Sequence, residues 1–340
     1  GSSCMIEGLS AGRYRLDVIA FPADGSRGGS ATCTFEVVPA VASNIIADHT
    51  IVDDYDRIPA YYMAEVKKMM VAFPGESHSV AYRTGMELLE AQNSDYACNV
   101  STAEPYTDRY LRVNTGSAGE ATWYTWYAYD NHDGANKDVI KNYIAGYVNN
   151  GYPMHAIGFG WCWDTTWTNG VTSVKDPFYG CGWAGSSEGG PDGNRAWGLD
   201  ADDYAITGNR VSMDTYLSAT EEYRLFCLNN SYPTRVIFTT SPVDGYTGES
   251  GYQRHLKHER IREFVRANPA RILFDYADIL CYDDGAGASN TATWNGHVYP
   301  VITAANLGDA SIGHIGAAGA VRLAKAQWWL MARIAGWDGV

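Results

Sequence analysis

From about residue 45 onward, apolar and polar positions follow a pattern that predicts strands and helices in turn. Short apolar runs over residues 68–73, 155–160, 235–240 and 271–280 are typical of buried strands. Between and after these runs, apolar residues at helical spacing predict helices over residues 79–92, 138–148, 213–228, 252–267 and 315–335. This order predicts an α/β sandwich around a parallel sheet, in which ligands bind at the carboxyl ends of the strands.

The first forty residues have a different pattern. Residues 13–21 and 31–38 are β-rich runs with alternating polar positions, and a turn-forming segment rich in Gly, Ser and Asp separates them. The pair resembles the last two strands of an immunoglobulin-like or fibronectin-type module. We therefore expect residues 1–40 to be a fragment of such a module, with further domains preceding it, and residues 45–340 to form the main domain.

Composition and charge narrow the classes of protein. The chain has 340 residues, 46% hydrophobic and 19% charged, which is typical of a globular protein. Thirty-nine acidic side chains against twenty-five basic ones give a net charge of −14, which disfavours a nucleic-acid partner. No apolar run approaches the ~20 residues that a membrane span requires, so we expect no membrane span.

Aromatic and cysteine residues favour a location outside the cell. Eleven Trp and twenty-four Tyr can supply rigid surfaces that stack on sugar rings, or can pack in the core. Cys4 with Cys33, and Cys162 with Cys181, flank a hairpin and a loop and are candidates for disulfides, with reduced buried thiols as the alternative. We expect a secreted, cell-surface or periplasmic protein that binds a polysaccharide or glycan.

The most informative segment is residues 69–79, Met-Met-Val-Ala-Phe-Pro-Gly-Glu-Ser-His-Ser. An apolar strand leads into a glycine turn and places Ser77 just before a helix. The N–H groups and dipole of that helix can stabilise negative charge that develops on a substrate oxygen. The alternative is that Ser77 or Ser79 serves only as a helix N-cap.

A serine nucleophile needs a base, and the segment before the last predicted helix supplies a candidate. His314 lies in a glycine-rich stretch there, and Asp309 precedes it. His314 is predicted to accept the proton of Ser77, and Asp309 to orient the imidazole. The alternative interpretation gives His314 a capping role and leaves Asp309 as a solvated loop residue.

Together these segments resemble the SGNH/GDSL hydrolase superfamily. Gly75-Glu-Ser77 is similar to the family's first block, Gly-Asp-Ser, and His314 with Gly319 matches the His and the following Gly of its last block. The resemblance covers roughly residues 45–338. It implies a flavodoxin-like three-layer α/β/α fold, ester hydrolysis with acetylated polysaccharides among the substrates, Ser77 as nucleophile, His314 as base, and no cofactor or metal.

The sequence departs from the family in its last block. The family places its Asp three residues before the His, whereas Asp309 lies five before His314 and position 311 is Ser. Asp309 reaches the imidazole only if the loop is shifted. The acidic clusters at 53–56 and 200–203 lack a complete calcium-binding pattern, so no metal is predicted.

The two blocks that complete the family's oxyanion hole also differ. The turn at residues 114–119 is the counterpart of the second block, and it makes Gly116 or Gly119 the expected donor beside the N–H of Ser77. The third block, Gly-x-Asn-Asp, reads Gly-Trp-Cys-Trp-Asp over residues 160–164 and has no Asn. An indole N–H of Trp161 or Trp163 is the predicted replacement.

A long segment from residue 161 to residue 210 follows the predicted strand at 155–160 and has no clear periodicity. Its position after a strand predicts that it forms a substrate-binding wall over the site, pinned by a disulfide between Cys162 and Cys181. The alternative is a loop packed around its own aromatic core. The substrate-binding candidates in this wall are Trp161, Trp163, Asp164, Trp167 and Trp183.

The sequence therefore predicts a secreted bacterial-type serine esterase that acts on carbohydrate. Three alternatives stay open. The first is a non-catalytic carbohydrate-binding protein on the same fold, favoured by the missing Asn and the aromatic loop. The second is a glycosidase or lyase that uses carboxylates such as Asp164 or Asp309. The third is an interaction module of a larger surface protein.

Overall fold

The chain divides into two compact units, Gly1–Ser43 and Asn44–Val340. The computed structural model describes residues 12–19, 30–37, 44–101, 105–116, 123–127, 137–163, 167–168, 184–185, 196–197, 213–285 and 287–339. In the first unit, strands β1 (Gly12–Ile19) and β2 (Ser30–Val37) pair antiparallel, with Gly12 opposite Val37 and Ile19 opposite Ser30. The hairpin predicted for this region is confirmed, whereas its membership of an immunoglobulin-like module stays a prediction.

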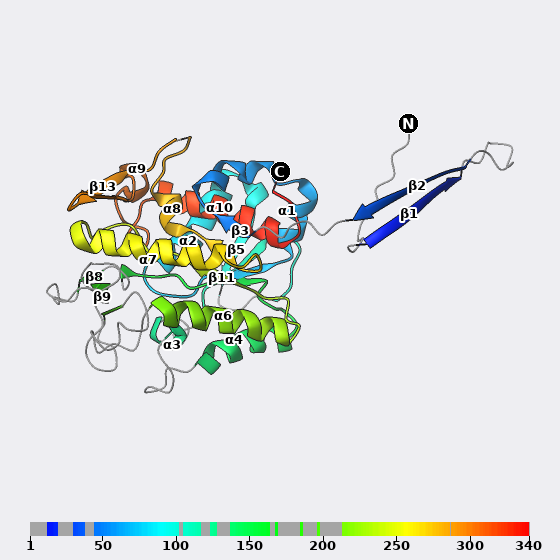
Figure 1. Ribbon diagram of the computed structural model, residues 1–340, viewed down its shortest axis with the longest axis horizontal. Helices are drawn as coiled ribbons and strands as arrows, with labels where there is room; N and C mark the ends of the chain where they lie inside the picture. The colour runs from blue at the N-terminus through cyan, green and yellow to red at the C-terminus, as the bar shows by residue number, and fades with distance from the viewer. Residues whose placement is uncertain are drawn as a thin grey trace. The chain divides into compact units, whose positions relative to one another are not determined.

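The second unit is built on a seven-stranded parallel sheet in the order β3-β12-β11-β7-β4-β6-β5 (Figure 1). Its strands are β3 (Ile45–Ala47), β4 (Met70–Ala72), β5 (Cys98–Ser101), β6 (Leu111–Asn114), β7 (Ala156–Ile157), β11 (Arg235–Thr239) and β12 (Ile272–Phe274). Smaller antiparallel sheets are formed by β8 (Trp167–Thr168), β9 (Ala184–Gly185) and β10 (Ala196–Trp197), and by β13 (Thr291–Trp294) with β14 (His297–Pro300).

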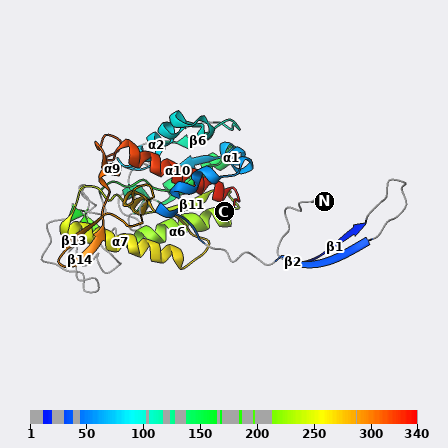
Figure 2. The same cartoon turned by 90° about the horizontal axis from the view of Figure 1, so that it is seen from above.

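Helices cover both faces of the large sheet, which makes the predicted three-layer α/β/α architecture (Figure 2). One face carries α1 (Ala60–Lys67), α2 (Ser79–Gln92), α8 (Tyr276–Leu280), α10 (Ala317–Ile334) and the 3₁₀ helix η1 (His49–Arg57). The other face carries α3 (Trp123–Tyr127), α4 (Lys137–Asn149), α6 (Met213–Asn229) and α7 (Gly248–Arg266). The short helices η2 (Ser94–Tyr96) and α9 (Ala304–Leu307) complete the unit.

Strand β4 shows why the central strands read as continuous apolar runs. All three of its residues are buried, and successive side chains point to opposite faces of the sheet. Val71 packs into the core under α2 and α10, while Met70 and Ala72 pack into the core under α4 and α6. A parallel strand covered on both faces therefore needs no polar alternation.

The strand expected over residues 271–280 is corrected by the structure. Only Ile272–Phe274 is a strand, and residues from Tyr276 onward form helix α8. The change occurs at Asp275, whose carboxylate accepts a hydrogen bond from the N–H of Asp278 at 3.2 Å and so caps the helix. Periodicity did not separate a short buried strand from a short buried helix here.

The buried carboxylate of Asp275 also holds the sheet to α7. It accepts two hydrogen bonds from the Arg262 guanidinium, at 2.6 and 2.8 Å, and one from the Thr240 hydroxyl at 2.9 Å. Burial lowers the pKa of Arg262, but the charge and hydrogen bonds of Asp275 outweigh this effect and raise it. Arg262 therefore stays protonated inside the protein.

Asp275→Ala is expected to destabilise the fold by about 3–5 kcal/mol, because it leaves the Arg262 charge buried without its main partner. Urea unfolding followed by circular dichroism measures the change. Asp54→Ala is the matched control, since Asp54 pairs with an Arg57 side chain that is 72% exposed, and its loss should change stability by less than about 1 kcal/mol. Equal effects of the two substitutions would contradict this interpretation.

Among the described residues, no helix combines the length and the apolar character needed to cross a membrane.

Candidate active site

The candidate site lies where the connections of two neighbouring central strands diverge. The chain leaves β4 toward α2 on one face of the sheet, and after β7 its next described helix is α6 on the other face. In open α/β sheets, such a divergence leaves a crevice at the carboxyl ends of the two strands, where ligands bind. The segments that follow β4 and β7 carry Ser77 and Cys162 respectively.

A close contact between two glycines holds these segments together. The N–H of Glu76 donates to the Gly160 carbonyl at 2.8 Å, and the N–H of Gly160 donates to the Pro74 carbonyl at 2.9 Å. Gly75 has a φ of +149°, and a Cβ there would lie 2.0 Å from the Gly160 oxygen. Only glycine fits this position, so the Gly75 of the sequence motif is explained by backbone packing.

Ser77 lies directly before α2, which begins at Ser79. The carbonyl of Ser77 already accepts the N–H of Val80 at 3.2 Å, so the serine belongs to the first turn. No described residue accepts a hydrogen bond from the N–H of Ser77. The helix N-terminus therefore presents an available donor and the positive end of its dipole beside the serine hydroxyl.

His314 is placed by a tight turn before α10. Ile312 and Ile315 exchange backbone hydrogen bonds at 2.9 and 3.1 Å, and the two residues between them have positive φ values, +52° at Gly313 and +70° at His314. A non-glycine residue in this conformation is uncommon and is often found at functional sites. The Nε2 of His314 lies 2.9 Å from the Ser77 Oγ.

Asp309 does not reach this histidine. Its carboxylate is exposed and accepts hydrogen bonds from the N–H and hydroxyl of Ser311, at 3.2 and 2.8 Å. Those bonds lower the pKa of the Asp309 carboxyl. The expectation that Asp309 orients the imidazole is thus corrected, because the loop folds its carboxylate back onto Ser311.

The carboxylate at the site belongs to Asp244, in the loop that follows β11. Asp244 is 2% exposed and accepts hydrogen bonds from the His78 Nε2 at 2.8 Å and the Trp163 Nε1 at 2.9 Å. Burial raises the pKa of Asp244, but the hydrogen bonds and charge of His78 and the bond from Trp163 outweigh it, so the net pKa is lowered. The carboxylate is therefore ionised.

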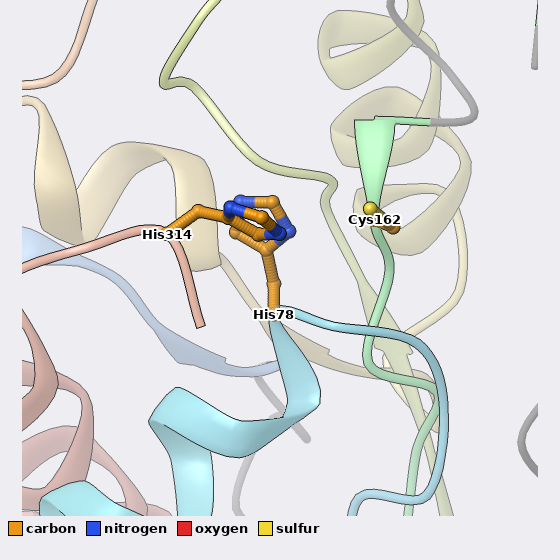
Figure 3. Close-up of side chains that lie close together, drawn as sticks. All are labelled: His78, Cys162 and His314. Atoms are coloured by element: carbon orange, nitrogen blue, oxygen red, sulfur yellow. The ribbon is translucent and has the colours of Figure 1, made fainter. Parts of the chain in front are cut away.

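His78 and His314 lie against each other, with ring centroids 4.7 Å apart (Figure 3). The ring of Trp163 lies 4.2 Å from that of His314 on centroids. No described carboxylate is hydrogen-bonded to the His314 imidazole, and the two rings that contact it are the ones bonded to Asp244. Burial and the neighbouring His78 lower the pKa of His314, and the charge of Asp244 partly opposes this shift. A lowered pKa leaves His314 neutral at neutral pH and able to accept a proton.

Cys162 also lies beside Ser77, in the segment whose sequence departs from Gly-x-Asn-Asp. Its Sγ lies 2.7 Å from the Ser77 Oγ. Cys162 carries a thiol and not a disulfide, so the suggested bridge to Cys181 is corrected. One feature of the sequence could have pointed to Cys162. It is the third residue of Gly160-Trp-Cys, where Gly-x-Asn has its Asn.

The expected oxyanion donor Gly116 is also corrected. Its N–H donates to the Asn114 side-chain carbonyl at 2.8 Å and is therefore used inside its own turn. The turn does adjoin the site, since a Cβ on Gly116 would lie 2.6 Å from the Pro74 Cβ. Gly119, the other expected donor, lies outside the described residues.

Of the predicted aromatic wall, the structure describes the side chains of Trp161 and Trp163. Trp163 lies at the site, but its N–H is bonded to Asp244. Trp161 is 2% exposed and packs in the core against Tyr127 and Tyr216, so neither its predicted wall position nor a donor role at the site holds. Asp164, Trp183 and the side chain of Trp167 lie outside the described residues.

This arrangement can activate a hydroxyl. A serine hydroxyl bonded to a neutral imidazole at a helix N-terminus has the geometry of a nucleophile with its base. A scan against protein-family models and a search of curated proteins both returned no match for this chain.

Proposed function

We propose that the protein is a serine ester hydrolase in which Ser77 is the nucleophile and His314 the general base. The observation that carries the proposal is the 2.9 Å contact between the Ser77 Oγ and the His314 Nε2. Two residues 237 positions apart in the sequence meet at the carboxyl edge of a parallel sheet. The neutral state of His314 suits the direction of proton transfer.

In the proposed mechanism, the Ser77 oxygen attacks the acyl carbonyl while its proton moves to the His314 Nε2. The oxyanion of the tetrahedral intermediate faces the first turn of α2, where the N–H of Ser77 is available. His314 then gives its proton to the departing alcohol. Water attacks the acyl-enzyme, again with His314 as base, and the carboxylic acid is released.

Asp244 stabilises the imidazolium that forms in each step. Its ionised carboxylate is fixed by His78 and Trp163, and both of their rings contact His314. The negative charge is buried, so solvent screens it weakly. The Ser77–His314 pair therefore replaces the expected triad, with Asp244 acting through intervening rings instead of through a hydrogen bond.

The substrate class proposed is a carbohydrate that carries acetyl-type esters, in a secreted or surface-located setting. Support comes from Trp163, an aromatic side chain that is partly exposed beside the reacting pair. Tyr246 lies edge-on to it, with ring centroids 6.0 Å apart. Aromatic faces of this kind suit stacking on sugar rings.

The test is labelling of the full chain with a fluorophosphonate, followed by mapping of the modified peptide. We expect one adduct, on Ser77, because only an activated serine attacks this phosphorus centre. Heat-denatured protein is the control for nonspecific reaction. An adduct on Cys162 would contradict the assignment of the nucleophile, and a folded protein that stays unlabelled would contradict the proposed activity.

A further inference from the structure

We propose that His78, Cys162 and His314 form a binding site for a borderline-soft divalent cation such as Zn²⁺. A ring nitrogen of each histidine and the Cys162 sulfur all lie within 4.8 Å of one another. Figure 3 shows the three side chains converging from the start of α2, the segment after β7 and the loop before α10. One thiolate and two imidazoles are a donor set that Zn²⁺ prefers.

The state of His78 points independently to a cation. His78 is fully buried, and its Nε2 is held by Asp244 at 2.8 Å. Its Nδ1 has no hydrogen-bond partner, although a buried polar atom without one is costly. In its neutral form, a histidine that donates one ring N–H to a carboxylate has a lone pair on the other nitrogen, which is the usual arrangement of a metal-ligating histidine.

The three donor atoms need only small movements to hold a metal. A tetrahedral Zn²⁺ with bonds of about 2.0–2.3 Å separates its ligand atoms by about 3.5 Å. Cys162 is partly exposed, and its sulfur lies within 4.8 Å of a ring nitrogen of each histidine. The Ser77 Oγ lies beside two of the donors, 2.7 Å from the Cys162 Sγ and 2.9 Å from the His314 Nε2.

Metal binding and hydrolysis exclude each other, a consequence that rests on the proposed function. The lone pair of the His314 Nε2 that accepts the Ser77 proton is the same one that binds the cation. A protein with metal bound has no general base and is inactive. The site is therefore a switch by which a thiophilic metal turns the proposed esterase off.

A second group with suitable side chains gives a control. Asp48, His49 and Asp278 also lie close enough to hold a cation. One oxygen of Asp278 accepts hydrogen bonds from both the backbone N–H and the Nδ1 of His49. These internal bonds account for the cluster, and none of its three side chains is among the unpartnered buried groups of the described residues, so it supports no metal site of its own.

The test titrates the full chain with Co²⁺, a spectroscopic substitute for Zn²⁺, and follows thiolate-to-metal charge transfer in the near ultraviolet. We expect one equivalent to bind with this band. Cys162→Ala should abolish the band. His314→Asn should weaken the affinity for Co²⁺ by at least roughly 10–100-fold, which is the loss typical even for residues that only hydrogen-bond a metal ligand. Asn is chosen because it tolerates positive φ. His49→Asn should bind as the unsubstituted chain does.

Two results would overturn the site. One is no stoichiometric Co²⁺ binding by the folded protein, and the other is Co²⁺ binding by Cys162→Ala and His314→Asn that equals binding by the unsubstituted chain. Because the readout is optical, it does not depend on the proposed hydrolase. The inhibitory consequence is tested apart, as loss of ester hydrolysis on adding one equivalent of Zn²⁺ and its recovery with EDTA. Activity that persists at saturating Zn²⁺ would refute the switch while leaving the site intact.

Discussion

Ser77→Ala is expected to lower kcat/KM for an activated acetyl ester by about 10⁴–10⁶-fold, because the substitution removes the attacking oxygen. The helix N-terminus and the neighbouring rings stay in place, so residual hydrolysis reflects binding and charge stabilisation alone. The measurement is release of p-nitrophenol from its acetate by the purified chain, with circular dichroism to show that the fold is retained.

Ser79→Ala is the matched control for this prediction. Ser79 lies two residues further on in the same motif, but its hydroxyl accepts a hydrogen bond from Arg83 at 3.0 Å. Its loss should change kcat/KM by less than about tenfold, since only one ordinary hydrogen bond is removed. The nucleophile would have to be reassigned if Ser77→Ala kept its activity or if Ser79→Ala lost it.

The contact between Ser77 and His314 was predictable because both residues have local signals in the sequence. Ser77 follows an apolar strand and a glycine turn and precedes a helix, and His314 lies in the glycine-rich segment before the last helix. Parallel sheets bring the segments after their strands to one edge, which makes a contact between such motifs a reasonable expectation. The α/β class and the five helices were predictable for a related reason, namely that long periodic segments carry strong signals.

The buried carboxylate of Asp244 at the site was not predictable in the same way. Asp309 precedes His314 by five residues, and spacing alone could not show that its carboxylate turns back onto Ser311. Asp244 lies 166 residues from His78 and meets it only after β11 and β4 have taken their places in the sheet. Its one local signal is an acidic residue in the loop after a strand, and many solvated acidic residues share that signal.

Trp161 and Trp163 show that composition does not predict which aromatic side chains are buried in the core. Two positions apart in the same segment, one packs into the core beneath the sheet and the other lies at the site. Whether an aromatic side chain faces the core or a ligand depends on the course of the chain after β7, which the pattern of residues does not encode. Cys162 between them was a candidate for a disulfide, with a reduced thiol as the alternative, and its sulfur lies 2.7 Å from the Ser77 Oγ.

Gly75→Ala is expected to destabilise the main domain by about 2–6 kcal/mol, because it combines a strained backbone with an overpacked contact. A Cβ on Gly75 would lie 2.0 Å from the Gly160 carbonyl oxygen, and φ at this position is +149°. The segments after β4 and β7 must then separate, which moves Ser77 relative to Cys162 and His314. Misplacement of about 1 Å can lower a rate by about 10²-fold. The folded variant should therefore also lose ester hydrolysis.

Gly146→Ala separates this effect from a general response to losing a glycine. Gly146 lies in the middle of α4, and a Cβ there would meet nothing within 4 Å. Alanine should stabilise that helix by about 0.5–1 kcal/mol, so the two glycine substitutions should shift the midpoint of urea unfolding in opposite directions. Unchanged stability of Gly75→Ala would mean that the contact between Gly75 and Gly160 does not hold the two segments, and the positioning of Ser77 would then need another cause.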